Sequence, residues 1–154
     1  MDKKTNPNFL LYKFSEWSRD ITSLASPLLL ILIPFIVLGT SSIFYKLLIA
    51  LLVNELIGSL IKIIFPKKRP NKQTYNSLIE KIDAGSFPSI HASRITLTYL
   101  TLFLNTDILI TKIVYIFVIL FVIISRVLLK KHFVIDVIGG FIIGFIIWFI
   151  TFVF

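Results

Sequence analysis

Five long apolar runs, separated by short polar segments, form the pattern of this chain. Such runs approach the ~20 residues that a helix needs to cross a hydrocarbon core of ~30 Å. We therefore predict an all-α fold, an integral membrane helical bundle of about five transmembrane helices. A soluble protein with buried core helices is the rival, but a chain this short has too little polar surface to cover these runs. The predicted spans are residues 22–40, 43–65, 89–105, 108–128 and 133–154.

The segment before the first run is polar but carries an apolar stripe. Phe9, Phe14 and Trp17 lie among charged side chains, which predicts a short N-terminal helix in the membrane interface. A disordered tail with a few aromatic residues is the alternative. A cleavable signal peptide is not predicted, because the apolar run starts only near Ile21 and no small-residue cleavage site follows it. No linker interrupts the chain, so residues 1–154 are predicted to form a single domain.

The composition indicates which class of molecule the protein binds. Hydrophobic residues make up 56% of the chain, and the formal net charge is +8. The basic residues lie at the ends of apolar runs rather than among aromatic residues of an exposed domain, so we expect anionic lipid or phosphate as the partner and no nucleic acid. The chain has no cysteine, which excludes a disulfide framework, a thiolate zinc site and a cysteine nucleophile.

One long polar loop, residues 66–87, determines how the remaining polar residues are arranged. If each run crosses the membrane, the second run ends on the side of this loop and the third begins there. The fourth run ends on the same side and the fifth begins there. Three polar clusters that are far apart in the sequence are therefore predicted to meet at one face of the membrane.

The first cluster consists of Lys62, Arg69 and Pro70. Pro66 disfavours helix at the residue before it, so Lys62 is predicted in the last turn of the second span and Arg69 in the loop beyond. Taken alone, the cluster is also explained by a lysine that extends towards the headgroups and by ordinary flanking charges.

The second cluster is Pro88-Ser89-Ile90-His91. Proline suits the first turn of a helix, so Ser89 and His91 are predicted at a helix N-terminus. Free backbone amides and the helix dipole attract an anion there. A capping serine and an interfacial histidine are the alternative.

The third cluster is Ser125-Arg126, followed by His132 and Asp136. Residues four apart on one helix share a face, so Asp136 can accept a hydrogen bond from one ring nitrogen of His132 and leave the other free to attack. Ionisable residues inside an apolar segment are costly and are functional candidates. A satisfied polar pair in a helix bundle is the alternative.

Together the clusters favour phosphoryl chemistry. The two histidines of the chain are predicted on one side with several cations and a serine, and an arginine fork matches the oxygens of phosphate. A metal site is disfavoured because few carboxylates accompany the two imidazoles. A serine hydrolase is disfavoured because the cations suit an anionic group better than an ester carbonyl.

The three clusters resemble the motifs of the type 2 phosphatidic acid phosphatase family, which shares its site with vanadium haloperoxidases. That family has lysine, six residues and arginine-proline; then proline-serine-x-histidine; then serine-arginine, five residues, histidine, three residues and aspartate. All three motifs match in order and spacing over residues 62–136. The soluble haloperoxidase branch does not fit a chain that is almost wholly membrane-spanning.

The resemblance implies a role for each residue. His132 would attack phosphorus and form a phosphohistidine, Asp136 would orient it, and His91 would protonate the leaving oxygen before water hydrolyses the intermediate. No metal or other cofactor would be needed for hydrolysis. Ile90 stands where the family often has glycine, so we expect its side chain to point away from the phosphate and to bear on the entrance. The implied phosphate-binding residues are Lys62, Arg69, Ser89 and Arg126.

Two charged residues outside the motifs lie within predicted spans. Glu55 precedes Lys62 by seven residues, and Arg94 follows His91 by nearly one helical turn. We predict that one or both join a buried polar network behind the site, and pairing with each other is one form of it. The alternative is that Arg94 faces the headgroups.

The predicted location is the cell membrane, as a multi-pass protein. The resemblance implies a site on the extracytoplasmic side. Every lysine and arginine except Lys46 and Lys112 falls on the side of the site, and the positive-inside rule would make that side cytoplasmic. Phosphate binding explains several of these cations, so we keep the outward-facing prediction.

The predicted reaction is hydrolysis of a lipid phosphate or diphosphate whose tail stays in the bilayer. Polyprenyl diphosphate is favoured because a chain this small leaves little room for a headgroup-recognition domain. Phosphatidylglycerophosphate, phosphatidic acid and a lipid A phosphate are alternative substrates. Transfer of phosphate to a lipid acceptor and a non-catalytic lipid-binding protein are alternative functions. The sequence does not predict the oligomeric state.

Overall fold

The structure is a computed structural model that describes residues 26–70 and 85–154. Within these ranges every regular element is a helix and no strand occurs, which confirms the predicted all-α bundle. The predicted interfacial helix lies outside the described residues. The helices are α2 (Pro27–Leu38), α3 (Ser42–Ile64), α5 (Ile90–Leu104), α6 (Leu109–Leu128) and α7 (Val134–Phe152).

Local sequence signals set the first helix limits. The Ser26 hydroxyl accepts the Leu29 N–H at 3.5 Å and caps α2, and the Ser41 hydroxyl accepts the Phe44 N–H at 3.3 Å and caps α3. A serine oxygen satisfies one of the free amides of the first turn in this way. Between these helices, Gly39 ends α2 with φ of 59°, a conformation that glycine adopts without steric cost.

Three helices, α3, α6 and α7, are long and apolar enough to cross a membrane. Helix α2 has 12 residues and α5 has 15. At 1.5 Å per residue, both are shorter than a hydrocarbon core of ~30 Å. The predicted number of helices is therefore confirmed among the described residues, but only three of these helices have the full length of a span.

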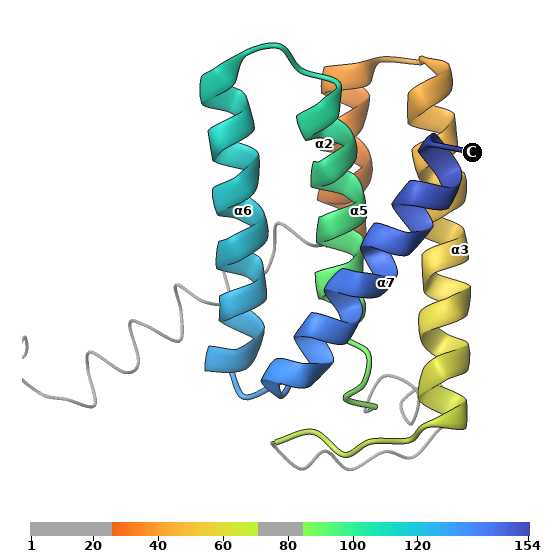
Figure 1. The fold of residues 1–154 in the computed structure, drawn as a ribbon, viewed down its shortest axis with the longest axis vertical. Coiled ribbons are helices and arrows are strands. Elements are labelled where there is room, and N and C mark those ends of the chain that lie inside the picture. The colour runs from red at the N-terminus through yellow and green to blue at the C-terminus, as the bar shows by residue number, and fades with distance from the viewer. Residues whose placement is uncertain (1–25, 71–84) are drawn as a thin grey trace, which may run out of the picture.

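Helix α5 is the central helix of the bundle and packs against each of the other four described helices (Figure 1). Most of its residues are buried, including several threonines. The hydroxyl groups of Thr96 and Thr101 donate to the carbonyl oxygens of Ala92 and Leu97, both at 2.8 Å. Because these bonds return to the same helix, the hydroxyl groups are satisfied inside an apolar core.

Two apolar clusters surround α5. The first joins α5 to α2 and α6, and the second joins α5 to α3 and α7. The buried members of the first are Leu30, Ile95, Tyr99, Leu102, Tyr115 and Val122. Those of the second are Leu47, Ala50, Leu97 and Ile147.

Two glycines allow α5 and α7 to approach closely. A Cβ atom added to Gly140 would lie 2.2 Å from the carbonyl oxygen of Ser89, and one added to Gly144 would lie 2.4 Å from that of Ser93. Small residues at helix contacts are typical of membrane proteins, where close packing replaces the hydrophobic effect between helices. The glycines therefore bring the start of α5 against the first turns of α7.

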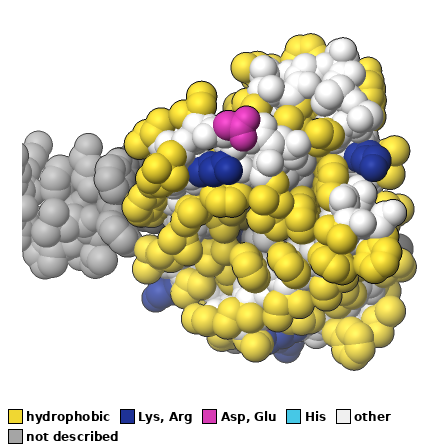
Figure 2. Space-filling model, turned by 45° about the horizontal axis from the view of Figure 1, so that its top comes forward, with side chains coloured by type: hydrophobic (Ala, Val, Ile, Leu, Met, Phe, Trp, Pro, Cys, Tyr) yellow, Lys and Arg dark blue, Asp and Glu magenta, His cyan; other side chains and the backbone are white. Residues whose placement is uncertain are grey.

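The outer surface of the bundle is apolar. Large hydrophobic side chains are exposed along α3, α6 and α7, and hydrophobic atoms cover most of the face shown in Figure 2, with few charged groups. Such a surface suits contact with lipid tails and not with water. The protein is therefore a membrane protein, as predicted.

The helix ends that carry the three polar clusters lie at one end of the bundle. Figure 1 shows the end of α3, the start of α5, the end of α6 and the start of α7 towards its lower end. The predicted meeting of these segments on one side is therefore confirmed.

Candidate active site

The first cluster lies at the end of α3. Lys62 is in the last turn, as predicted, and only 5% of its surface is exposed. Arg69 follows in the segment beyond the helix and is half-buried. A lysine that extended towards the headgroups would keep its ammonium group in water. Burial of Lys62 inside the protein therefore argues against a simple flanking charge.

The second cluster forms the start of α5. Ser89 is the N-cap residue, and its hydroxyl oxygen accepts the Ala92 N–H at 3.4 Å. The helix begins at Ile90 and places His91 in its first turn, as predicted. The prediction that Pro88 lies in the first turn is wrong, because the extended backbone of Ser89 delays the helix by one residue after Pro88.

Ile90 packs between α5 and α3. A Cβ atom added to Gly58 would lie 3.0 Å from Cγ1 of Ile90, so the isoleucine fills the space that this glycine leaves, about one turn before Lys62. Ile90 is buried. Its side chain therefore belongs to the contact between α5 and α3.

The third cluster spans the turn between α6 and α7. Ser125 and Arg126, in the last turn of α6, are 2% and 6% exposed. The chain then reverses at Lys130, whose φ of 52° is uncommon for a residue with a side chain. After the reversal the His132 N–H donates to the Arg126 carbonyl oxygen at 3.2 Å. This turn holds His132 beside the arginine.

The predicted hydrogen bond between Asp136 and the His132 ring does not form. The prediction assumed that both residues lie on one helix, but α7 begins at Val134 with Phe133 as its N-cap, so His132 lies outside the helix. Its Nδ1 is instead 2.7 Å from the carbonyl oxygen of Ser86. A carbonyl oxygen only accepts, so Nδ1 carries the proton and Nε2 keeps its lone pair.

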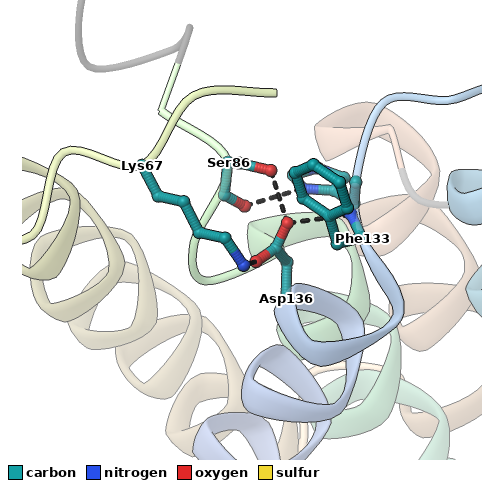
Figure 3. Close-up of polar contacts among 5 residues, drawn as sticks. Lys67, Ser86, Phe133 and Asp136 are labelled. Atoms are coloured by element: carbon teal, nitrogen blue, oxygen red, sulfur yellow. Dashed lines mark hydrogen bonds and ion pairs between the residues drawn. The ribbon is translucent and has the colours of Figure 1, made fainter. Parts of the chain in front are cut away.

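Asp136 is fully buried and joins three segments (Figure 3). Its Oδ1 accepts from Nζ of Lys67 at 2.6 Å, and its Oδ2 accepts from the Phe133 N–H at 2.8 Å and from the Ser86 hydroxyl. Its carbonyl oxygen accepts the Ser89 N–H at 2.9 Å. Asp136 therefore reaches the histidine through Ser86, and also fixes the start of α5.

Both histidines lie among the predicted cations. The charges of Arg126, Arg69 and Lys62 act on His132. His91 is within range of the charges of Arg126, Arg94 and Lys62. Guanidinium and ammonium groups can balance and orient a dianionic phosphoryl group between two imidazoles. The structure therefore unites the two predicted catalytic histidines with three of the four predicted phosphate-binding residues, while Ser89 caps the helix that carries His91.

The environment of His132 disfavours its protonated form. Burial, followed by the charges of Arg126 and Arg69, lowers the pKa of His132 to about 3, and the hydrogen bond to the Ser86 carbonyl acts in the opposite direction. The imidazole is therefore neutral at physiological pH, as a nitrogen nucleophile requires.

Glu55 and Arg94 pair with each other. Nη2 of Arg94 donates to Oε2 of Glu55 at 2.5 Å, and Nε donates to Oε1. The side chains of Glu55 and Arg94 are 36% and 19% exposed, so Arg94 binds α3 and is largely covered by protein. They line a pocket of about 320 Å³ between α2 and α3. Whether this bidentate pair supports the chemistry stays a prediction.

Lys67 and Ser86 were not predicted as site residues. Lys67 falls among the six variable residues of the first motif, in a run of three basic residues, and nothing in the run distinguishes it from Lys68. Ser86 precedes the second motif by two residues. The only sequence signal for Lys67 and Ser86 is that they lie near the motifs. Their shared partner, Asp136, is 50 residues or more away in the sequence, so no local spacing indicates the pairing.

Within the described residues, no group of three histidine, aspartate or glutamate side chains is arranged to hold a metal ion. The charged groups around the histidines are mainly cationic. The arrangement is therefore suited to bind an anion.

Comparison with known proteins agrees with the motifs and the fold. No curated protein matches the chain. A solved structure, described as the first transmembrane PAP2 type phosphatidylglycerolphosphate phosphatase from Bacillus subtilis, is similar with a TM-score of 0.71 and 25% sequence identity; the match covers 90% of this chain and 74% of that one. Residues 43–154 match the model of the PAP2 superfamily. This chain, with its three motifs at one end of a membrane helix bundle, belongs to the PAP2 superfamily.

Proposed function

We propose that this protein is a membrane lipid phosphatase that removes phosphate from a lipid through a phosphohistidine on His132. The observation that carries the proposal is the state of the His132 ring. Nδ1 donates to the Ser86 carbonyl oxygen at 2.7 Å, which leaves the Nε2 lone pair available for attack. The superfamily and the similarity to a solved phosphatidylglycerolphosphate phosphatase support the reaction class.

In the first step, Nε2 of His132 attacks phosphorus as the bond to the lipid oxygen breaks, and His91 donates a proton to that oxygen. The charge on the phosphoryl oxygens is balanced by Lys62, Arg69 and Arg126, which act on the histidine ring electrostatically. Asp136 positions the ring, and the Ser89 hydroxyl, which still has a proton to donate, adds a hydrogen bond.

In the second step, the neutral His91 takes a proton from water, and the water oxygen attacks the phosphorus of the phosphohistidine. The phosphorus–nitrogen bond breaks, inorganic phosphate leaves and His132 recovers its lone pair. His91 holds this proton opposite the phosphoryl group, whose negative charge offsets the burial and the charges of Arg126 and Arg94 that disfavour its protonated form. Because water attacks the same phosphorus, a lipid hydroxyl in its place would give phosphate transfer.

The proposed substrate is a lipid phosphate or diphosphate whose tail stays in the bilayer. Polyprenyl diphosphate follows from the small size of the chain, and the description of the similar structure favours phosphatidylglycerophosphate as the second candidate.

We propose that the site faces the extracytoplasmic side of the cell membrane. Because the chain has no cysteine, a single cysteine introduced at Asn76 tests this in intact cells. Labelling by an impermeant reagent supports the proposal, and protection contradicts it.

The function is tested with the purified full chain in lipid nanodiscs and a panel of the candidate lipids. We expect phosphate release from at least one lipid, no release by His132→Ala, and a loss of about 10²–10⁴-fold with His91→Ala. A phosphoenzyme should be trapped only when His132 is present. Adding a lipid acceptor distinguishes hydrolysis from transfer. If neither the wild type nor His132→Ala releases phosphate from any lipid, a non-catalytic lipid-binding protein is favoured. Equal release by the two proteins would contradict His132 as the nucleophile.

A further inference from the structure

Three contacts connect the loop segments on either side of residues 71–84 to the start of α7, and a fourth joins the two segments to each other. Nζ of Lys67 donates to Oδ1 of Asp136 at 2.6 Å, and the Ser86 hydroxyl donates to Oδ2. The Ser86 N–H donates to the carbonyl oxygen of Lys67 at 2.7 Å. Nζ of Lys67 also lies 4.9 Å from the centroid of the Phe133 ring. Lys67, Ser86 and Asp136 thus form a closed ring of contacts.

These contacts extend to His132, the proposed nucleophile. Ser86 uses its hydroxyl group on Asp136 and its carbonyl oxygen on Nδ1 of His132. Asp136 also accepts the N–H of Phe133, the residue directly after His132, at 2.8 Å. The imidazole ring of His132 is therefore positioned in two ways. Ser86 accepts the proton of Nδ1, and Asp136 fixes the backbone at the next residue, Phe133.

Because these residues are buried, loss of one partner would carry a high free-energy cost. Ser86 and Asp136 are fully buried and His132 is 2% exposed, so an unpaired carboxylate at Asp136 would carry a large desolvation penalty. The Lys67 side chain is 39% exposed and supplies the counter-charge from the loop. Lys68, next to it, is exposed and offers a matched control.

We propose that Lys67 and Ser86 are positioning residues, which act through Asp136 to hold His132 with Nδ1 protonated and Nε2 directed at phosphorus. This inference rests on the proposed function and deepens it. None of the hydrogen bonds of Asp136 reaches the His132 ring, so its effect on the ring passes through Ser86 and through the backbone of Phe133. Lys67 then keeps the carboxylate in place.

A double-mutant cycle tests this coupling. We expect Lys67→Met to lower kcat on the order of tenfold with KM changed less than about twofold, as for other residues that act through a neighbour. Asp136→Asn should lower kcat further, and Lys67→Met/Asp136→Asn should match Asp136→Asn alone. Lys67→Arg should restore most of the activity. The proposal is overturned if the two substitutions are additive, or if Lys67→Met behaves like Lys68→Met.

A spectroscopic test is independent of turnover. The chain has two histidines, so protein labelled with ¹⁵N-histidine, with His91→Asn for assignment, gives the ring nitrogens of His132. We expect the Nδ1–H form in the wild type and in Lys68→Met, and a mixture of ring states in Lys67→Met. An unchanged spectrum in Lys67→Met overturns the proposal. If the wild type shows the expected spectrum but hydrolyses no lipid, the proposed function fails while the positioning role stands.

Discussion

The side of α5 that faces α7 and the side that faces α3 are packed in different ways. Towards α7, backbone meets backbone, because Gly140 and Gly144 have no Cβ atoms to hold the helices apart. Towards α3, side chains make the contact: Ile90 fills the space at Gly58, and Arg94 pairs with Glu55. A pocket of about 320 Å³ lies beside this ion pair.

The difference shows how the start of α5 is positioned. A backbone contact leaves little freedom, and the Ser89 N–H also donates to the Asp136 carbonyl oxygen at 2.9 Å. The α3 side is held by longer side chains, which can change rotamer at modest cost. We therefore expect catalysis to be sensitive to small changes on the α7 side and more tolerant on the α3 side.

Gly140→Ala should have the largest effect. The new Cβ atom would lie 2.2 Å from the Ser89 carbonyl oxygen, so the start of α5 must move by about 1 Å, and a displacement of that size near reacting groups costs on the order of 10²-fold. The measurement is kcat/KM for lipid phosphate hydrolysis. Gly144→Ala is the control, with a Cβ atom 2.4 Å from the Ser93 carbonyl oxygen, one turn further from the site. Equal losses of activity in both variants would contradict the comparison.

Glu55→Gln should have the next largest effect. It leaves the half-buried Arg94 without a counter-charge, and polar contacts between membrane helices contribute about 1–2 kcal/mol. We expect a lower Tm and a loss of activity of about three- to tenfold, less than for Gly140→Ala. Glu55→Gln/Arg94→Gln should recover part of the Tm, because no charge is then left unpaired. Unchanged Tm and activity in Glu55→Gln would show that the pair supports neither the fold nor the site.

The next effect in size should be the pH dependence of the free energy of unfolding, and its source is His132, just before α7. Burial and nearby arginines lower the pKa of His132 from 6.5 to about 3. Between these values the unfolded chain binds a proton that the folded chain does not, so this contribution to stability is complete above pH 6.5 and is lost as the pH falls towards 3. We expect the Tm to fall more steeply with acid in the wild type than in His132→Asn. Parallel curves for the two proteins would refute the assignment.

Gly58→Ala should have the smallest effect. Its Cβ atom would lie 3.0 Å from Cγ1 of Ile90 and 3.3 Å from Cδ1, and a side chain can yield where a backbone cannot. We expect a cost of about 1 kcal/mol in stability and little change in activity. Gly58→Ala/Ile90→Ala removes the overlap, so the losses of Tm from the two substitutions should be less than additive. A loss of activity as large as that of Gly140→Ala would remove the difference between the two sides.

The helices and the motif residues were largely predictable, because their signals are local. Apolar runs predicted the helices, and the end of α3 before Pro66 placed Lys62 in its last turn. The spacing of the motifs predicted which residues meet. The predicted span over residues 89–105 was the shortest of the five and began with polar residues, which agrees with the short α5. The 12 residues described for α2 were not predicted.

The contacts of Asp136 were not predictable from spacing. A separation of four residues indicates a shared face only if both residues are helical, and the turn at Lys130 leaves His132 outside α7. The acceptor of its proton is a backbone carbonyl oxygen, at Ser86. Every residue has such a group, so side-chain identity does not reveal which one will be used.

The sequence by itself determined the membrane bundle and the residues that meet at one end of it, because hydrophobic periodicity and motif spacing are properties of the chain. The tertiary structure alone decided how those residues are connected. Lys67 could pair with Asp136 and Lys68 could not, because only the folded loop places one of two adjacent lysines against the buried carboxylate. Hydrogen bonds depend on distance and direction over a few tenths of an ångström, and packing between distant segments sets both.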